Sequence, residues 1–316
     1  MGRSDKGGIA LVALASLFWA VSYSVLSRLT QEGIPPLVVE FHLLLWAAVA
    51  ALLLLVVTGR ADELWAFQRQ ETHFLVLVAT GGYGFWLFQA LALRRLDPTT
   101  AHLAFYVGPL MAGVILAFQG KATPRKHLVA LLWAFVGAII IFRDPARYST
   151  PAGGTAALWS RGYGAAAGWA LCWVFFSMVG NSLMESAKAL PAAALVLAVG
   201  AVCLLITCIG AGRNVLGISA NQLVACMGAG GLAVACSFTL WLKALGRLSL
   251  VSAAGLWYLG VLFVAVADYF LEGLTPGWLT LGGAILILLG VRGGLRHKPR
   301  ADTTIGDIIR GSWGEQ

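Results

Sequence analysis

Ten apolar runs, each close to twenty residues long, constrain this chain more than any other feature of its sequence. They lie near residues 8–27, 37–57, 73–93, 98–118, 126–143, 162–183, 190–211, 220–243, 249–271 and 276–294. Because a helix rises about 1.5 Å per residue, about twenty residues cross the roughly 30 Å of hydrocarbon in a bilayer. The apolar residues are continuous and do not alternate, which argues against membrane strands. We therefore expect an all-α integral membrane protein with ten transmembrane helices in a lipid bilayer.

The charged residues are few, and their placement predicts an orientation. Only 11% of the 316 residues are charged, whereas soluble domains contain about 25%. If the ten helices alternate in direction, fifteen of the 22 lysines and arginines fall on the side of the two termini. The positive-inside rule then predicts that both termini are cytoplasmic. The net charge of +8 belongs to these loops and a basic tail, so no nucleic-acid partner is expected.

The chain carries one unit twice. Residues 92–124 overlay residues 244–276 without a gap, at a constant offset of 152. We predict a first five-helix repeat over 1–143, a linker over 144–161, a second five-helix repeat over 162–295 and a cytoplasmic tail over 296–316. Because five is odd, the second copy must enter the membrane from the opposite side. Two inverted repeats with a site between them are typical of transporters that work by alternating access.

Several helices carry stripes of aromatic and polar side chains that could line a cavity between the repeats. The candidate substrate-binding residues are Trp19, Tyr23, Tyr83, Trp86, Gln89, His102, Tyr106, Trp169, Trp173, Phe176, Ser237, Trp241, Trp257 and Tyr258. Tryptophan and tyrosine also gather at membrane interfaces and in ordinary helix packing. For His102 the sequence leaves two roles open, a substrate contact or a neutral structural residue that is hydrogen-bonded to a neighbouring helix.

Glycines and one proline mark places where helices can bend. The candidate hinge or kink residues are Gly81, Gly82, Gly84, Pro109, Gly228, Gly230 and Gly231. Glycine clusters loosen a helix or let another backbone approach, and a proline in mid-span removes a hydrogen-bond donor. We expect Pro109 to kink the fourth helix, whereas its repeat partner Val261 should leave the ninth helix straight.

The charges inside the predicted helices are Glu40, His42, Asp268 and Glu272, all toward helix ends. Proton-driven carriers keep a carboxylate deep in the membrane, and none is evident, so we expect facilitated or weakly coupled movement. An intramembrane enzyme would need a nucleophile with a base, or a metal cluster, and no such motif is present. No catalytic residue, metal site or cofactor is therefore expected. A channel is disfavoured because nothing resembles a charged or carbonyl-lined filter.

Some residues carry a resemblance to a known family. They are Trp19 in the first helix, Pro35-Pro36 before the second, and Phe270-Leu271-Glu272-Gly273-Leu274-Thr275-Pro276 before a glycine-rich last helix. With ten helices in two inverted fives, the chain resembles the drug/metabolite transporter superfamily, EamA type, and within it the YddG-type bacterial exporters of aromatic amino acids. The resemblance implies a bacterial inner-membrane carrier that moves solute out of the cytoplasm.

An aromatic lining with few fixed charges suits a flat, partly apolar solute, such as an aromatic or other large neutral amino acid. A multidrug or other metabolite exporter of the same superfamily is the alternative. An exporter of quaternary amines would be expected to add a buried acid to the aromatic lining. The sequence leaves the solute and the oligomeric state open, and a monomer is compatible with it.

Overall fold

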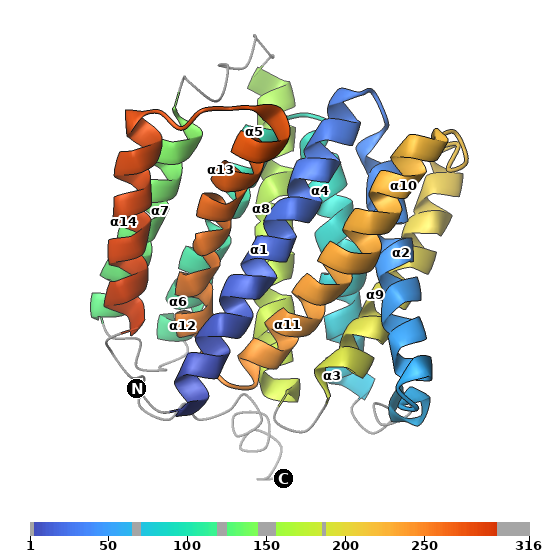
Figure 1. Ribbon diagram of the computed structural model, residues 1–316, viewed down its shortest axis with the longest axis horizontal. Coiled ribbons are helices and arrows are strands. Elements are labelled where there is room, and N and C mark those ends of the chain that lie inside the picture. Colours follow the sequence, from blue (N-terminus) through green and yellow to red (C-terminus); the bar gives the residue numbers. More distant parts are fainter. Residues whose placement is uncertain (1–2, 65–70, 119–124, 145–155, 185–187, 296–316) are drawn as a thin grey trace.

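The computed structural model describes residues 3–64, 71–118, 125–144, 156–184 and 188–295. Every element described there is helical (Figure 1). Ten stretches are long and apolar enough to cross a membrane, from Lys6–Gln31 to Trp278–Leu295. The prediction of an all-helical protein with ten spans is confirmed.

The first half contains five spans. They are α1 (Arg3–Gln31), α2 (Pro36–Val57), a third span made of α3 (Glu71–Leu77), η2 (Val78–Gly84) and α4 (Phe85–Leu93), a fourth made of α5 (Pro98–Phe105) and α6 (Gly108–Phe118), and α7 (Arg125–Phe142). We call the side of the molecule where α1 begins, at the bottom of Figure 1, the near side, and the opposite side, at the top, the far side.

The second half repeats this arrangement. Its spans are α8 (Ala156–Leu183), α9 (Ala189–Gly210), an eighth span made of α10 (Ala220–Gly228), η3 (Ala229–Val234) and α11 (Ala235–Leu245), a ninth made of α12 (Leu250–Trp257) and α13 (Leu259–Glu272), and α14 (Trp278–Leu295). The helix α8 begins on the far side, and α14 ends on the near side (Figure 1). The two five-helix halves are therefore inverted with respect to each other.

Two predicted segments lie partly or wholly beyond this description. Residues 145–155 of the expected linker and residues 296–316 of the expected tail lie outside the described residues. The helix α8 already begins at Ala156, so its first six residues fall within the segment that was predicted as linker.

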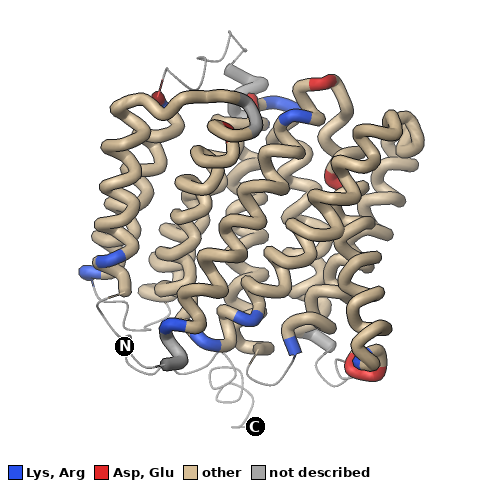
Figure 2. Tube along the Cα trace, viewed as in Figure 1, with Lys and Arg blue, Asp and Glu red and all other residues tan. Residues whose placement is uncertain are grey.

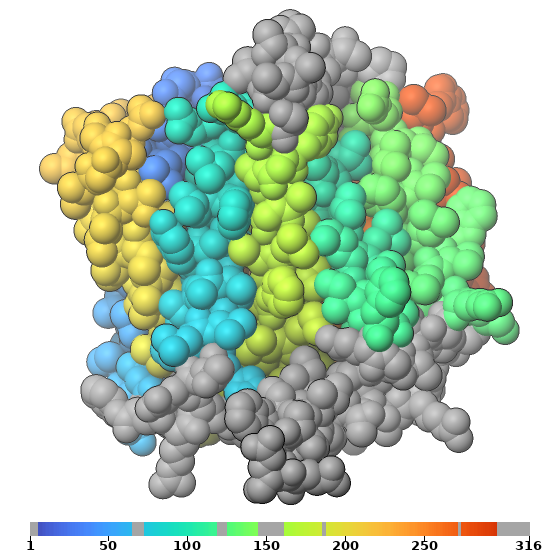
Figure 3. All heavy atoms as spheres, turned by 180° about the vertical axis from the view of Figure 1, so that it is seen from behind, coloured from blue at the N-terminus to red at the C-terminus, as the bar shows by residue number. Residues whose placement is uncertain are grey.

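Charge is confined mainly to the ends of the spans. Figure 2 shows lysines and arginines at the near and far ends of the helices, with long uncharged stretches between them. Seen from behind, α8 lies between the α3–η2–α4 span and the α6–α7 region, and the atoms of neighbouring spans meet along this face (Figure 3). The helices thus form one packed bundle with an apolar girdle.

Glycines bring helices of opposite halves into close contact. The helices α7 and α14 run side by side, and a Cβ added at Gly137 would lie 2.6 Å from the carbonyl oxygen of Gly283. A Cβ added at Gly283 would lie 2.6 Å from the oxygen of Gly137. Small residues permit this approach where lipid supplies no hydrophobic force between helices.

The third and eighth spans each contain a π-helical segment at equivalent places in the two repeats. The segment η2 is built from Val78–Gly84 and η3 from Ala229–Val234. A Cβ at Gly82 would lie 2.5 Å from the oxygen of Val196, and one at Gly230 would lie 2.4 Å from the oxygen of Leu43. Each π segment therefore presses its backbone against the second span of the other half. Such segments occur frequently at functional sites.

The fourth and ninth spans are both interrupted, although only the fourth contains the predicted proline. The helix α5 ends at Phe105, four residues before Pro109, where the proline ring would clash with the carbonyl group of a continuing helix. The ninth span breaks between Trp257 and Leu259 without a proline. The prediction that Val261 leaves this span continuous is wrong.

A hydrogen bond joins the interruption of the ninth span to that of the fourth span. The hydroxyl group of Tyr258 donates a hydrogen bond of 2.9 Å to the carbonyl oxygen of Tyr106, its repeat partner. Tyr106 follows the last residue of α5, where carbonyl groups lose their intrahelical partners. A buried side chain from the opposite half thus satisfies one of these groups at the break in the fourth span.

Asp144, which follows the fifth span, caps the beginning of the last helix, α14. Asp144 is 2% exposed, and its Oδ2 accepts hydrogen bonds from the backbone N–H of Gly277 (3.1 Å), the backbone N–H of Thr280 (3.0 Å) and the hydroxyl of Thr280 (2.7 Å). Gly277 directly precedes α14 and Thr280 lies in its first turn, where backbone N–H groups have no partner within the helix. A residue predicted to begin the linker is thus a cap between the halves.

Candidate functional site

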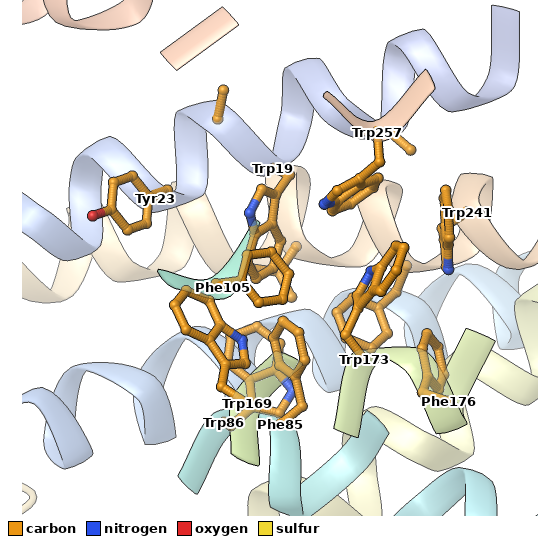
Figure 4. Packing of buried hydrophobic residues seen from close by; sticks show 14 of the residues in the cluster. Trp19, Tyr23, Phe85, Trp86, Phe105, Trp169, Trp173, Phe176, Trp241 and Trp257 are labelled. Atoms are coloured by element: carbon orange, nitrogen blue, oxygen red, sulfur yellow. The ribbon is translucent and has the colours of Figure 1, made fainter. Parts of the chain in front are cut away.

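Aromatic side chains from both halves meet in the middle of the bundle. They surround a cavity lined by Trp19, Phe85, Trp173, Phe176, Ser237, Phe238, Trp241 and Trp257 (Figure 4). Its volume is about 10 Å³, which is the room that one water molecule needs. A solute as large as an amino acid therefore requires the rings to separate. The arrangement is a closed one in which the rings fill the site with one another.

Six of the residues predicted from the helix stripes line this cavity. They are Trp19 on α1, Trp173 and Phe176 on α8, Ser237 and Trp241 on α11, and Trp257 on α12. The rings of Trp19 and Trp257 are 6.1 Å apart, and those of Trp173 and Trp257 are 5.8 Å apart. These six residues come from four of the six spans on which stripes were predicted, and the stripes of the third and fourth spans do not reach the cavity.

Two wall residues were missed by the sequence analysis. Phe85 is the first residue of α4, and its ring meets the edge of Trp19 at 5.3 Å. Phe238 stacks on Trp86 at 5.6 Å. Their nearness in sequence to Trp86 and Ser237 was the available signal, but a phenylalanine in a span can also face lipid, as Phe270 does at 77% exposure.

Trp86, Gln89 and Trp169 lie behind the wall. The indole N–H of Trp86 donates to the carbonyl oxygen of Gly81 at 3.0 Å, and Trp169 stacks on Phe105 at 4.1 Å. Gln89 is 1% exposed, and its Oε1 has no partner among the described residues. These residues support the lining rings and do not line the cavity in this closed form.

His102 belongs to a second aromatic group, which also contains Tyr23, Tyr106 and Tyr258. The ring of His102 lies 3.7 Å from that of Tyr23 and stacks on that of Tyr106 at 5.0 Å. Neither ring nitrogen has a hydrogen-bond partner among the described residues, so the bond that the structural alternative required is not seen. The hydroxyl of Tyr23 donates to the carbonyl oxygen of Pro98. Trp169, 5.8 Å from His102, joins this group to the cavity wall.

Tyr83 is not brought to the cavity. It was expected on one face with Trp86 and Gln89, but its hydroxyl lies 3.0 Å from that of Thr207 on α9. The π segment η2 ends at Gly84, between Tyr83 and Trp86. Because a π turn holds more residues than an α turn, the 3.6-residue spacing that grouped these side chains does not apply across it.

The predicted hinge glycines divide by environment. Gly81, Gly82 and Gly84 lie in η2, and Gly230 and Gly231 lie in η3. A Cβ at Gly81 would lie 2.1 Å from the ring of Phe176, a residue of the cavity wall. Gly228 ends α10, and a Cβ there would meet nothing within 4 Å. The segment η2 therefore packs against the cavity wall and η3 packs against the backbone of α2, whereas a side chain at Gly228 would meet no close neighbour.

One acid is buried more completely than its place in the sequence suggested. Glu40 is the fifth residue of α2, near the helix end as expected, but it is 0% exposed, and neither carboxyl oxygen has a partner among the described residues. Asp268 is 7% exposed and accepts a hydrogen bond of 3.4 Å from Ser24. The expectation of facilitated movement rested on the absence of a buried carboxyl, and Glu40 removes that ground.

Polar contacts join the two halves at each end of the bundle. On the near side, Glu63 forms ion pairs with Arg60 at 2.8 Å and with Lys188 of the other half. On the far side, the amide of Gln222 donates to Glu32 at 3.1 Å. Hydrogen bonds from Arg60 and then Lys188 lower the pKa of Glu63 to about 2. The near-side contact is therefore between full charges at neutral pH, whereas the far-side contact pairs a charge with a neutral amide.

Comparisons with known proteins agree with this architecture. Residues 6–143 and 160–293 each match the model of the EamA-like transporter family. The chain belongs to the EamA-like transporter family. The two EamA domains coincide with the two five-helix halves, and membership makes the protein a membrane transporter and not an enzyme.

Other comparisons add the fold alone. A solved crystal structure aligns with 95% of this EamA chain and 99% of its own chain, with a TM-score of 0.76 and 18% sequence identity. At that identity the likeness concerns the fold. A search of the curated proteins finds no match. The comparisons thus show the EamA fold and the transporter class, but they do not identify the solute.

Proposed function

We propose that this EamA protein exports aromatic or other large neutral amino acids by alternating access, in the manner of the YddG-type exporters. One observation carries the proposal: a wall of tryptophan and phenylalanine rings from both halves surrounds the central cavity, and none of the described residues that line it is ionisable. Rings of this kind hold a flat solute by stacking. The 15-to-7 distribution of basic residues supports cytoplasmic termini, and the resemblance to the YddG-type exporters supports a bacterial inner-membrane location.

Alternating access requires that the contacts between the halves open in turn on the two sides. In the closed arrangement both the Glu63–Lys188 ion pair and the Glu32–Gln222 hydrogen bond are made. The two π segments lie where the third and eighth spans press on α9 and α2. Opening then separates the wall rings and admits the solute from one side. An exporter of drugs or other metabolites would use the same movement, and transport assays separate the two.

The function is tested by counterflow into liposomes. Purified protein is reconstituted, and labelled tryptophan, phenylalanine, threonine and a cationic dye are offered in turn. We expect counterflow of tryptophan and phenylalanine that exceeds that of threonine, because only the first two present a flat ring to the wall. Uptake of the dye alone would contradict the amino-acid proposal.

Removal of a wall ring should reduce transport without unfolding the protein. Trp173→Ala deletes a side chain that contacts Trp241 and Trp257, and we expect the initial rate of tryptophan counterflow to fall at least about tenfold, since such a deletion removes more than about 1.4 kcal/mol of contact. His102→Ala and Tyr106→Phe should lower it less. Trp133→Ala, on the lipid face of α7 at 52% exposure, is the matched control. Normal transport by all three site variants would contradict the proposal that this cavity binds the solute.

The near-side ion pair should depend on pH in a defined direction. Since the pKa of Glu63 is lowered to about 2, its contribution to stability is complete above its ordinary pKa of 4.5 and is lost as the pH falls through about 2. We expect Glu63→Gln to melt slightly below the parent protein at pH 7, and the difference to vanish near pH 2. Melting curves in detergent over this range provide the measurement. A difference that grows on acidification would show that the pair does not hold the halves together.

A further inference from the structure

The cavity wall contains buried hydrogen-bond donors that have no acceptor among the described residues. The indole N–H groups of Trp19, Trp173 and Trp257 have no partner among the described residues, although these side chains are only 2–3% exposed. The indole N–H can donate but never accept. Buried polar groups are nearly always paired, so three unpaired donors around one cavity require an explanation.

The other polar groups of the wall are already engaged. The N–H of Trp241 donates to the hydroxyl of Ser177 at 3.2 Å, and the hydroxyl of Ser237 donates to the carbonyl oxygen of Ala15 at 2.9 Å. The unpaired polar atoms on the wall are therefore all donors, and within the part of the chain that the structure describes neither a carboxylate nor any other ionisable group lines it. A solute that brings only donors, such as an ammonium group, would find no free partner of this kind.

The geometry shows how the donors become available. Trp257 lies between Trp19 and Trp173, with ring centroids 6.1 and 5.8 Å away, and its nitrogen lies at the end of the ring nearest Trp19 (Figure 4). In the closed form the surface of the cavity is almost entirely carbon. The donor edges are packed against neighbouring rings, where a contact with a ring face replaces only part of a hydrogen bond. Separation of the rings around a solute would expose these edges to it.

We propose that this site recognises the hydrogen-bond acceptor of its solute, a carboxylate on a flat apolar group, through the N–H groups of Trp19, Trp173 and Trp257. The solute's amino group is not a recognised feature. This inference rests on the proposed function, because it names which part of the exported molecule the same site reads. Neutral N–H donors in a water-free pocket bind a carboxylate without a neighbouring cation, since hydrogen bonds to a charged acceptor are about twice as strong as neutral ones.

Binding to the full-length protein in detergent micelles tests the inference without transport. Equilibrium dialysis measures the Kd of three labelled compounds with the same ring, namely tryptophan, 3-indolepropionate, which lacks the amino group, and tryptamine, which lacks the carboxylate. We expect tryptophan and 3-indolepropionate to bind within about tenfold of each other and tryptamine to bind at least about tenfold more weakly. Tryptamine that binds as tightly as 3-indolepropionate would overturn the proposal.

Substitutions that remove only the N–H group sharpen the test. Trp19→Phe, Trp173→Phe and Trp257→Phe each keep a ring in the wall, and at least one should weaken 3-indolepropionate about tenfold more than it weakens tryptamine. Trp241→Phe is the control, because its N–H is already paired with Ser177. Its smaller ring should change both Kd values by the same factor. A constant ratio of the two Kd values in all three test variants would show that the wall acts by shape alone.

The outcomes separate this inference from the proposed function. If 3-indolepropionate binds selectively and tryptophan shows no counterflow, the site reads a carboxylate but the protein does not export amino acids. If tryptophan is transported and tryptamine binds as tightly as 3-indolepropionate, the proposed export is supported and the proposed recognition of the carboxylate is contradicted. Absence of binding by all three compounds overturns the inference, whatever the transport result.

Discussion

Gly200→Leu should cause a large loss of stability. A Cβ at Gly200 would lie 2.0 Å from the carbonyl oxygen of Gly82 and 2.6 Å from its carbonyl carbon. Overpacked cores lose about 1–3 kcal/mol when side chains can shift, and occasionally more. Here the obstacle is the backbone of η2, which cannot rotate away. The expected cost therefore exceeds about 3 kcal/mol, a large part of an ordinary stability of roughly 5–15 kcal/mol.

Size-exclusion chromatography and thermal melting of the purified protein measure this effect. Gly210→Leu is the matched control, because Gly210 ends the same helix and a Cβ there meets nothing within 4 Å. It should elute and melt like the parent protein. Gly200→Ala should fall between the two. A monodisperse Gly200→Leu protein that melts within a few degrees of the parent would mean that η2 and α9 separate at little cost.

Asp144→Ala should cause the second large loss of stability. The substitution removes one carboxylate but leaves three donors at the beginning of α14 without their acceptor. A hydrogen bond to a charged group contributes about 1.5–3 kcal/mol, and each buried unpaired donor costs about 1–3 kcal/mol. Because these terms overlap, we expect a total loss of about 3 kcal/mol and early separation of α14 from α7.

Thermal melting in detergent, with Asp144→Asn and Asp62→Ala beside it, isolates the cause. Asparagine keeps one acceptor oxygen, so it should lose about half as much stability as alanine. Asp62 is exposed, and its replacement changes the net charge equally without removing a cap. Equal melting temperatures for Asp144→Ala and Asp62→Ala would show that water can replace the carboxylate at this helix end.

The spans and the inverted halves could be predicted because their signals are local or repeated. A run of twenty apolar residues specifies a span whatever surrounds it, and the match of residues 92–124 to 244–276 needs no knowledge of contacts. The cap by Asp144 could not be predicted in this way. Its role depends on donors 133 to 136 positions away, and its neighbours Pro145 and Arg147 have the composition of a linker.

The candidate site was predicted in part, and the errors have a common origin. Trp19, Trp173 and Trp241 stand out as bulky, polar-edged rings on helix faces, and they meet at the cavity. Tyr83 was misplaced because the face was drawn with a constant helical period through η2. Phe85 and Phe238 were missed because a phenylalanine in a membrane helix carries no mark that separates a lining ring from one in lipid. Periodicity therefore finds faces, whereas helix irregularities decide which side chains share one.

Each of the two π segments accommodates one extra residue within a membrane span. A π turn within an α-helix is equivalent to one residue inserted into a regular helix. Elsewhere in a span, such an insertion would turn every following side chain by about 100° and carry lining residues into lipid. In η2 and η3 the wider turn absorbs the extra residue. The helices α4 and α11, which hold Phe85, Trp86, Phe238 and Trp241, continue directly from these two segments.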